Sequence, residues 1–397
     1  MLLLAASLTS LSGMIQLVVA VATITLVLVS GVESILGLAP AIFLAAGALA
    51  AYPAGSLMDR VGRVPVLAGG FATGIVGCTA TALGCATASV ALVVAGFVLV
   101  GLANGTVLLA RTAAADMVRP ERKARAISVV LFGVLFGAVL GPLVFRPLFE
   151  GKELSLNNLV VPWLVAGGFA LLGLLLTLAV RPDPRTIALA LQTARDEPSV
   201  PAAPLRDILR RPGVPTALLS AITSFAVMVG VMNLTGYIVI GHRHEQADVF
   251  TVISAHIVGM YGLVLVIGEV VDRVGRRAAQ ISGLLVMGAS TLPLVWVDSV
   301  LGTSIALFGL GLGWNVSYVA AAADLVTYAT SAERGRLVGL SDLASGIAGA
   351  TLALLGGVAY SEIGVGAVGV GATALVVVPA TLLLLRRRPV PVPAGAG

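Results

Sequence analysis

Long apolar runs separated by short polar segments dominate this 397-residue chain and constrain its fold more than any other feature. Each run approaches or exceeds the roughly 20 residues that an α-helix needs to cross a bilayer. The chain is 58% hydrophobic and 11% charged, a balance that soluble domains do not show. The predicted spans are residues 6–30, 36–57, 64–86, 89–116, 126–148, 159–180, 214–240, 248–270, 278–297, 300–326, 338–360 and 364–385. We therefore predict an all-α membrane protein with twelve transmembrane helices in a lipid bilayer.

A short polar motif between the second and third runs is repeated between the eighth and ninth. The first copy reads Gly55-Ser-Leu-Met-Asp59-Arg60-Val-Gly62-Arg63, and the second, 213 residues later, reads Gly268-Glu-Val-Val-Asp272-Arg273-Val-Gly275-Arg276. A repeat offset slightly over half of the chain length indicates a duplicated half. We therefore predict two pseudo-symmetric six-helix halves, 1–180 and 213–388, a cytoplasmic linker, 181–212, and a disordered tail, 389–397.

Most of the 24 Lys and Arg residues lie in one set of alternate loops. These loops include both motif copies, the linker and the segment after the last apolar run. Because positively charged loops stay on the cytoplasmic side, we predict that both termini face the cytoplasm of a cell membrane. The net charge of +5 is then a topology signal, and we expect no nucleic-acid partner. The linker's last part, Leu205–Arg211, fits either a short amphipathic surface helix or a solvated basic stretch.

Both motif copies resemble the signature loop of the major facilitator superfamily, which joins the second and third membrane helices. The family pattern is roughly G-x-x-x-D-R-x-G-R-[RK], and the first copy departs from it with Val64-Pro65 after Arg63. The resemblance implies the twelve-helix fold of that superfamily, secondary transport, and alternating access about a central site. It also implies a latch, in which Asp59 and Arg63 hold the halves together on the cytoplasmic side. The alternative is a polar turn that only enforces topology.

We call the two motif copies the signature loops, and we expect their glycines to permit close approach of a neighbouring helix. Asp116 and Asp324 end the fourth and tenth spans at matching places, so we predict that Arg63 pairs with Asp116 and Arg276 with Asp324. Asp342 sits where Asp59 should approach, and repulsion would make one of them titrate or face away. The predicted gating residues are Gly55, Asp59, Arg60, Gly62, Arg63, Asp116, Gly268, Asp272, Arg273, Gly275, Arg276 and Asp324.

The resemblance implies a central cavity between the first, fourth, seventh and tenth helices. Each of these helices carries polar side chains spaced three, four or seven residues apart, which places them on one face. Polar groups facing lipid are expensive, so these faces should point inward. Each group could instead bond only a neighbouring helix. The predicted substrate-binding residues are Gln16, Thr23, Asn104, Arg111, Asn233, Tyr237, Trp314, Asn315 and Tyr318.

Two ionisable residues lie deep within predicted spans. A charge such as Arg111 costs roughly 2.5–3.5 kcal/mol there, so it either snorkels to the interface or binds an anionic or carbonyl-bearing substrate. The helix-4 arginine usual in the family would fall at Phe97, which weakens the transfer of that role to Arg111. His256 is the candidate proton-coupling residue, and the alternative is a neutral imidazole bonded to a carbonyl of the next helix.

The fifth span reads Gly133-x-x-x-Gly137-x-x-x-Gly141-Pro142 and resembles the antiporter motif of the same superfamily, although Leu143-Val144 replace two glycines. Gly137, Gly141 and Pro142 are the predicted motif residues, and tight helix packing explains them nearly as well. The drug/proton antiporter branch often carries an acid in helix 1, which is missing here before Glu33. The sequence resembles that branch in its helix-5 motif and departs from it in helix 1.

The function predicted from these features is proton-coupled efflux of small amphipathic compounds by a monomer. The alternative is uptake or facilitated exchange of a small organic anion, which would use Arg111. A non-transporting sensor or scaffold would need a soluble domain, and the loops are short. The sequence contains no visible nucleophile–base set, phosphate-binding loop or metal-ligand cluster, so we expect no enzyme activity, no cofactor and no metal.

Overall fold

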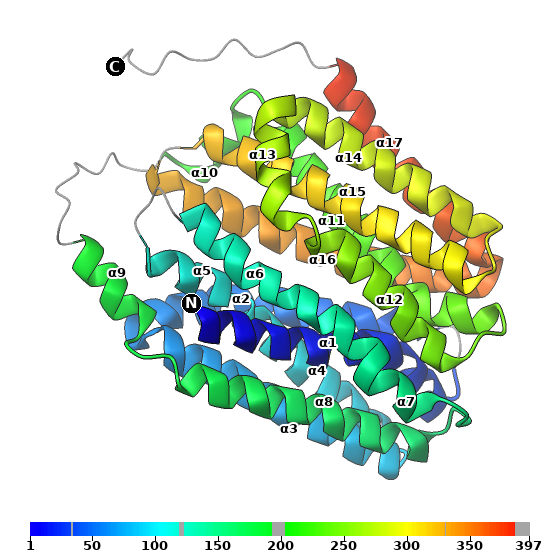
Figure 1. The fold of residues 1–397 in the computed structure, drawn as a ribbon. Helices are drawn as coiled ribbons and strands as arrows, with labels where there is room; N and C mark the ends of the chain where they lie inside the picture. Colours follow the sequence, from blue (N-terminus) through cyan, green and yellow to red (C-terminus); the bar gives the residue numbers. More distant parts are fainter. Residues whose placement is uncertain (33–34, 119–122, 193–202, 330, 386–397) are drawn as a thin grey trace, which may run out of the picture.

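The computed structural model describes residues 1–32, 35–118, 123–192, 203–329 and 331–385, which form helices joined by short loops (Figure 1). We call α1 to α8 the N-terminal half and α11 to α17 the C-terminal half. The first comprises α1 (Leu2–Ser30), α2 (Leu38–Val61), α3 (Arg63–Ala86), α4 (Val90–Val107), α5 (Ala110–Asp116), α6 (Lys123–Leu140), η3 (Gly141–Phe145), α7 (Arg146–Phe149) and α8 (Leu156–Leu178). The second comprises α11 (Val214–Gly241), α12 (Gln246–Tyr261), α13 (Val264–Val274), α14 (Arg276–Thr291), η4 (Leu292–Val295), α15 (Val300–Thr327), α16 (Ser331–Ile363) and α17 (Val365–Leu385).

The helices fall at the predicted places along the chain. Within the described residues, ten are long and apolar enough to cross a membrane, and α12 with α13, bent by 41°, makes an eleventh candidate. The remaining predicted span, 126–148, coincides with α6, η3 and α7. The all-α prediction is confirmed, and no strand forms in the part of the chain that the structure describes.

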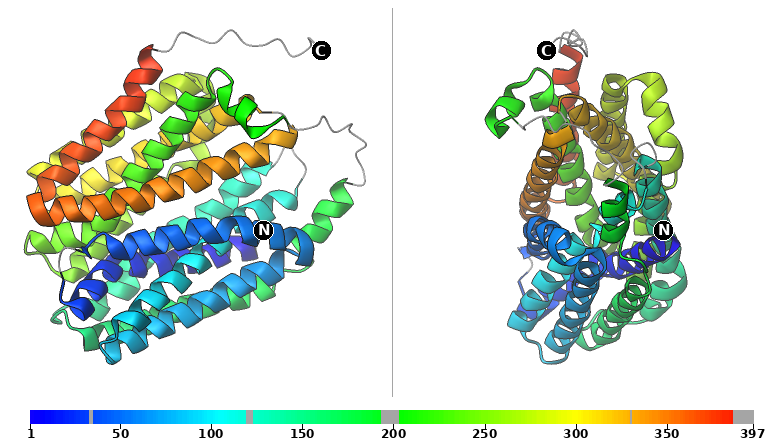
Figure 2. Two further views of the ribbon diagram at one scale, coloured as in Figure 1. Left: turned by 180° about the vertical axis from the view of Figure 1, so that it is seen from behind. Right: turned by 90° about the vertical axis from the view of Figure 1, so that its left-hand side faces the viewer.

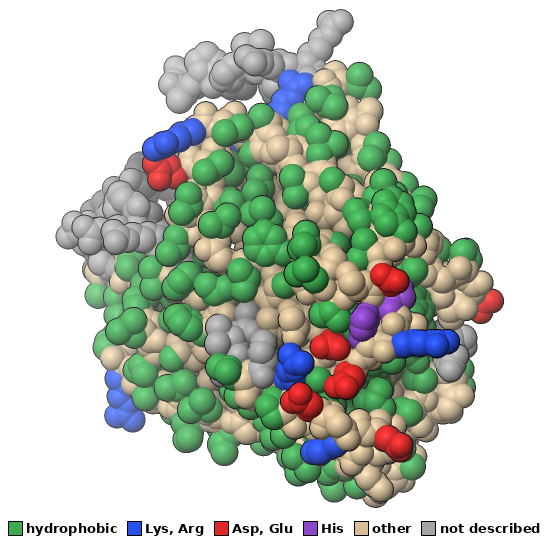
Figure 3. All heavy atoms as spheres, turned by 45° about the vertical axis from the view of Figure 1, so that its right-hand side comes forward, with side chains coloured by type: hydrophobic (Ala, Val, Ile, Leu, Met, Phe, Trp, Pro, Cys, Tyr) green, Lys and Arg blue, Asp and Glu red, His purple; other side chains and the backbone are tan. Residues whose placement is uncertain are grey.

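The two halves lie side by side, with their helices running in roughly one direction (Figures 1 and 2). Contacts between them come mainly from α1 with α11, α2 with α16, and α6 with α12. Hydrophobic side chains cover a broad band of the outer surface, and charged side chains gather toward its ends (Figure 3). Such a band is what a bilayer requires of a multi-helix protein, because lipid chains solvate apolar groups alone.

Glycines set how closely several helices approach. Added Cβ atoms at Gly133 and Gly137 would meet the backbone of Ala5 and the side chain of Ser12, so α6 packs tightly on α1. This confirms the packing explanation for Gly133 and Gly137, and the backbone becomes π-helical shortly afterwards, at Gly141–Phe145. Small residues allow such contacts because dispersion contacts and short hydrogen bonds, rather than the hydrophobic effect, hold membrane helices together.

The linker contains two helices, α9 (Pro184–Gln192) and α10 (Leu205–Arg210). The second confirms the helical alternative for its last part. Arg211 then forms a two-pronged bond with the buried carboxylate of Glu333 at the start of α16, with N···O distances of 2.7 and 2.9 Å. The hydrogen bonds that Arg211 donates to Glu333 raise the pKa of Arg211, so this pair stays ionised at alkaline pH. The predicted tail, 389–397, lies outside the described residues.

Candidate functional site

The first signature loop is a helix junction that requires glycine at one position. α2 ends at Val61 and α3 begins at Arg63, so Gly62 alone joins them, with φ at +111°. An added Cβ at this position would lie only 2.8 Å from Oδ2 of Asp183. Glycine is therefore required both for the backbone conformation and for the space that the carboxylate fills.

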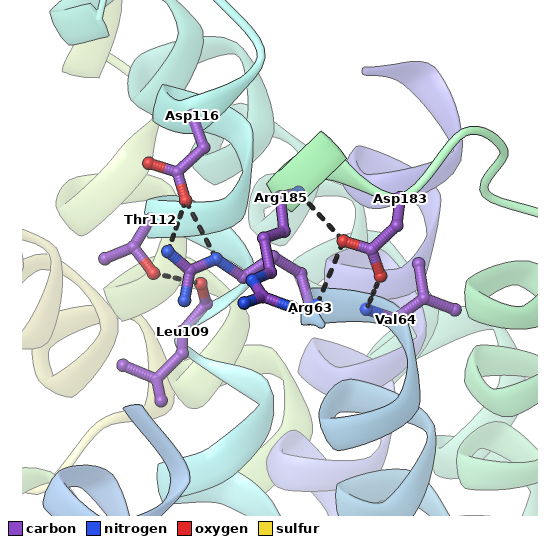
Figure 4. Close-up of polar contacts among 7 residues, drawn as sticks. All are labelled: Arg63, Val64, Leu109, Thr112, Asp116, Asp183 and Arg185. Atoms are coloured by element: carbon purple, nitrogen blue, oxygen red, sulfur yellow. Dashed lines mark hydrogen bonds and ion pairs between the residues drawn. The ribbon is translucent and has the colours of Figure 1, made fainter. Parts of the chain in front are cut away.

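Asp183, which follows α8, caps the start of α3. Its Oδ1 accepts a hydrogen bond from the backbone N–H of Arg63 at 3.0 Å, and its Oδ2 accepts one from Val64 at 2.9 Å (Figure 4). These amides have no partner within the helix, and a carboxylate there also interacts favourably with the helix dipole. The sequence analysis did not predict a role for Asp183. The feature that could have indicated it is its position between two prolines directly after the sixth predicted span.

Arg63 binds Asp116, as predicted. Its Nε and Nη2 each lie 2.8 Å from Oδ2 of Asp116, and both side chains are mostly buried (Figure 4). Both residues belong to the N-terminal half. This bond therefore fastens the loop to the end of α5 within one half, whereas the predicted latch placed Arg63 between the halves. The side chain of Asp59, the other residue of that latch, lies outside the described residues.

The second signature loop is built differently. The predicted pair of Arg276 and Asp324 is wrong for this conformation, because Asp324 instead accepts a hydrogen bond from Nε2 of Gln280 at 3.3 Å. The neighbouring Arg277 donates to the carbonyls of Leu383 and Leu384 at the end of α17. The helix that enters this loop is broken between α12 and α13, whereas α2 runs unbroken into the first loop. The two loops therefore differ both in their side-chain contacts and in the helices that lead into them.

Of the other predicted gating residues, Arg60, Gly268, Arg273 and Gly275 are exposed, and Gly55 is half-buried. Added Cβ atoms at Gly55 and Gly268 would meet open space, so the close helix approach that we expected at these glycines does not occur. The carbonyl of Arg60 accepts a hydrogen bond from Arg185, and Arg273 pairs with Glu269 one turn earlier. Gly275 has φ at +91°, matching Gly62. The side chain of Asp272 lies outside the described residues.

A central cavity of about 170 Å³ lies between the halves. Its described lining comes from α1, α2, α4, α6, α11 and α12, and most of these side chains are apolar. The polar lining residues are Ser12, Gln16, Asn104, Asn233 and Tyr261. No charged side chain occurs among the described lining residues. The prediction that the first, fourth and seventh helices face a cavity is therefore confirmed for Gln16, Asn104 and Asn233.

Gln16 joins the halves at the wall of this cavity. Its Nε2 donates to Oγ of Ser254 in α12 at 2.8 Å, while its Oε1 is buried without a protein partner. A buried acceptor without a donor is destabilising by roughly 1–3 kcal/mol. The Oε1 of Gln16 is therefore an unpaired acceptor at the wall of the central cavity, which a ligand donor would satisfy once the amide turns toward the cavity.

A second cavity, of about 150 Å³, adjoins the first and shares Asn104, Leu108 and Phe225 with it. It lies closer to the signature loops and contains Arg111, whose Nη2 lies 3.0 Å from Oδ2 of Asp342 in α16. Tyr318 donates its hydroxyl hydrogen to Oδ1 of the same carboxylate at 2.8 Å. The Arg111 side chain therefore neither extends to the membrane interface nor lies in the cavity without an ionic partner. It forms an ion pair between the two halves, which sequence reasoning missed.

The remaining predicted substrate-binding residues divide into two groups. Thr23 lines a narrow space that adjoins the central cavity at Asn233. Tyr237, Trp314 and Asn315 lie outside the lining of these cavities. Tyr237 packs edge-on against Tyr360, Asn315 donates to the carbonyl of Met260, and Trp314 stacks on Tyr318. These three side chains therefore contact neighbouring helices, as the alternative to substrate binding predicted.

His256 is fully buried in α12. Its Nδ1 lies 2.8 Å from the carbonyl oxygen of Leu307 in α15, and it is absent from the lining of the three cavities. This placement matches the alternative in which the imidazole bonds a carbonyl of a neighbouring helix. Because the histidine lines none of the three cavities, water in them does not reach its ring directly.

Residues 2–326 match the family model of the Major Facilitator Superfamily. The chain belongs to this superfamily. An uncharacterized superfamily transporter of Bacillus subtilis, YdeG, is 30% identical over 334 residues, which cover 83% of this chain and 78% of the relative. A riboflavin transporter of Brucella anthropi, RfnT, is 29% identical over 306 residues, covering 74% and 72%. A multidrug resistance protein of Salmonella typhimurium, MdtM, is 28% identical over 297 residues, covering 69% and 67%.

The fold of this superfamily member also matches solved structures. The inward-open conformation of the xylose transporter XylE from E. coli superposes with a TM-score of 0.73 at 17% identity, covering 97% of this chain and 95% of XylE. The family and its relatives indicate a multi-pass membrane transporter rather than an enzyme. The predictions of a superfamily transporter and of its fold are therefore confirmed.

Proposed function

We propose that this transporter exports small, largely apolar and uncharged compounds from the cell in exchange for protons. The observation that carries the proposal is the central cavity, whose described walls are apolar apart from hydroxyl and amide groups. A compound without formal charge enters such a cavity without burying an unpaired ion, which would be strongly unfavourable. Apolar walls with a few placed hydrogen-bonding groups are typical of small-molecule sites.

The alternative, uptake or exchange of an organic anion, depends on a cation that is available to the ligand. The guanidinium of Arg111 is engaged by Asp342, whose other carboxylate oxygen accepts from Tyr318. An anion would have to displace a carboxylate that is already held by two partners. The charge arrangement therefore favours uncharged compounds over anions.

The direction and orientation are proposed on three grounds. The sequence Gly137-x-x-x-Gly141-Pro142 resembles the antiporter motif of the superfamily, and this resemblance favours export. One relative, MdtM, is named a multidrug resistance protein. The loops at the end of the bundle that carries Gly62 and Gly275, which we call the signature-loop end, contain most of the basic residues. Basic loops favour the cytoplasmic side of a cell membrane.

The proposal is tested in inside-out vesicles that contain the protein and hold an acid interior. The vesicles are given radiolabelled chloramphenicol as an uncharged probe, tetraphenylphosphonium as a cation and benzoate as an anion. We expect gradient-driven accumulation of the uncharged probe above that of vesicles without the protein. Accumulation of benzoate alone would replace the proposal with the anion alternative, and accumulation of the cation alone would overturn the assignment of an uncharged substrate.

The contribution of Gln16 is tested by Gln16→Leu, which keeps the size of the side chain and removes both polar atoms. Loss of one ligand hydrogen bond of roughly 0.5–1.5 kcal/mol should weaken binding by about 2- to 12-fold. The measurement is the Kd for chloramphenicol by scintillation proximity on purified protein. The matched control is Asn157→Leu, an exposed amide at the start of α8. Equal affinities for the two variants would exclude Gln16 from the binding site.

A further inference from the structure

The ion pair between Arg111 and Asp342 joins the two halves of the molecule next to a cavity. Arg111 comes from α5 in the N-terminal half, and Asp342 comes from α16 in the C-terminal half. Both side chains are 34% exposed, so water in the second cavity reaches them. The pair lies on the signature-loop side of the central cavity and bridges the boundary that must open and close during alternating access.

We propose that Asp342 is the residue that binds and releases the transported proton, and that the proton acts by breaking the bond to Arg111. This inference rests on the proposed exchange of substrate for protons. It assigns the coupling role to a carboxylate in α16, in place of the histidine predicted from the sequence.

The first argument is one of access. Asp342 is the acidic side chain among the described residues that line the three cavities. Of the other described acids near the loops, Asp116 is engaged by Arg63, Asp183 by backbone amides and Glu333 by Arg211. Because the second cavity shares lining residues with the central cavity, a proton that enters the substrate pathway arrives next to this carboxylate.

The second argument concerns the surroundings of Asp342. Among the described residues, Arg111 of α5 and Tyr318 of α15 bond it directly, and Tyr261 of α12 lies behind them as the next titratable group. α2 presents Gly47, Ala48 and Ala51 to this cavity, and α11 presents Phe225. Arg111 is thus the one ionic partner of the carboxylate among these groups, and protonation of Asp342 leaves it a neutral hydrogen-bonding partner of Tyr318.

The third argument concerns the opposite end of the halves. There α2 and α16 approach so closely that an added Cβ at Gly357 would overlap the backbone of Gly37. Nε2 of Gln246 in α12 donates to the carbonyl of Ala20 in α1 at 3.1 Å, and Phe250 contacts Phe145 and Phe149. This end is held mainly by close packing, together with the Gln246 bond and a longer ion pair of 3.9 Å between Arg146 of α7 and Asp248 of α12. On the signature-loop side, by contrast, the Arg111–Asp342 pair lies in a cavity that adjoins the substrate pathway, and one proton can neutralise it.

The step conserves charge and involves no covalent change to the substrate. When the opposite end is open, a proton from that side binds the carboxylate of Asp342 and forms a neutral carboxylic acid. Arg111 then lacks its ionic partner, and the halves can part at the signature-loop end. When the proton leaves to the cytoplasm, the carboxylate pairs again with Arg111 and closes that end behind an outgoing substrate. The proton shifts the equilibrium between the two states because it binds one of them more tightly.

The test replaces Asp342 by Asn, which keeps the shape and a hydrogen bond to Tyr318 but cannot ionise. Two transport assays are compared in proteoliposomes with radiolabelled chloramphenicol. We expect gradient-driven accumulation to fall at least tenfold, while exchange of labelled for unlabelled probe without a gradient stays within about threefold of the wild type. The matched control is Glu362→Gln, an exposed carboxylate at the far end of the same helix. It should leave both assays unchanged.

A spectroscopic measurement tests Asp342 without any substrate. Trp314 stacks on Tyr318 at a centroid distance of 5.3 Å, and Tyr318 bonds the carboxylate, so a proton on Asp342 changes the environment of the indole. We expect the tryptophan fluorescence of purified protein to change in a single step as the buffer is acidified, and this step should be lost in both Asp342→Asn and Trp314→Phe. The step should persist in Glu362→Gln.

The outcomes separate this inference from the proposed function. Retained gradient-driven transport in Asp342→Asn, or loss of exchange together with accumulation, would overturn the coupling role. A fluorescence step that survives in Asp342→Asn would overturn it as well. If the wild type exchanges the probe but never responds to a pH gradient, the proposed proton exchange itself is wrong, whatever the fluorescence shows.

Discussion

Replacing Asp183 by Ala removes the cap at the start of α3, and the loss of stability follows from the hydrogen bonds that the cap accepts. The carboxylate accepts from the backbone amides of Arg63 and Val64 and from that of Arg185 at 2.8 Å. Loss of a helix cap costs roughly 0.5–2 kcal/mol, and hydrogen bonds to a charged group contribute about 1.5–3 kcal/mol. Water can reach part of this site, so we expect a loss of about 2 kcal/mol.

The chain carries its own reporter for this measurement. Cys78 and Cys85 are both free and buried in α3, so a thiol-reactive dye reacts with them only when the helices come apart. At roughly 2–4 °C per kcal/mol for a large domain, Asp183→Ala should lower the unfolding temperature by about 4–8 °C. Asp183→Asn, which keeps one carbonyl oxygen as an acceptor, should lie between this variant and the wild type.

The control is Asp298→Ala, an exposed acid whose carbonyl, rather than its side chain, accepts a hydrogen bond from His244. This control should unfold at the wild-type temperature. If Asp183→Ala unfolds together with Asp298→Ala, then the cap does not stabilise α3 and the reasoning from hydrogen bonds is wrong. A drop that is equally large for Asp183→Asn would instead indicate that the charge alone matters.

Two further predictions use the same dye assay. Gly62→Ala should lower the unfolding temperature by more than Asp183→Ala does, because it adds a strained backbone to the displacement of the carboxylate; an unchanged temperature would contradict the required glycine. Glu333→Gln should cost about 1–3 kcal/mol, below the value for a fully buried pair because Arg211 is 33% exposed. The raised pKa of Arg211 means that its contribution is present below the ordinary arginine pKa and is lost only as pH rises through the folded value. The temperature difference between wild type and Glu333→Gln should therefore stay constant from pH 7 to 10, and a decline over that range would contradict the assignment.

Features that depend on local spacing were predictable from the sequence. The apolar runs placed the helices, and the matching positions of Asp116 and Asp324 led to the correct pair between Arg63 and Asp116. The same reasoning failed for Arg276, because Asp324 bonds the amide of Gln280 instead. A repeat in sequence does not guarantee a repeat in side-chain contacts.

Contacts between segments far apart in the sequence were not predictable. Asp183 and Arg63 are 120 residues apart, and Arg111 and Asp342 are 231 apart, so only the docking of helices brings each pair together. Helical spacing placed Trp314 and Asn315 near Tyr318, but it could not say which face of α15 meets the cavity and which meets its neighbours. That choice is made by packing around the whole bundle.

The fastening of the linker sets a limit on how far the molecule can move. At one end Asp183 is bound to the start of α3 in the N-terminal half, and at the other Arg211 and the amide of Ala203 are bound to Glu333 in the C-terminal half. Between Gln192, the last residue of α9, and Ala203 the chain contains residues 193–202. A fully extended segment of this length reaches only about 35 Å. While both anchors hold, the length of this segment sets the largest distance by which α9 and Glu333 can separate in any conformation of the transport cycle.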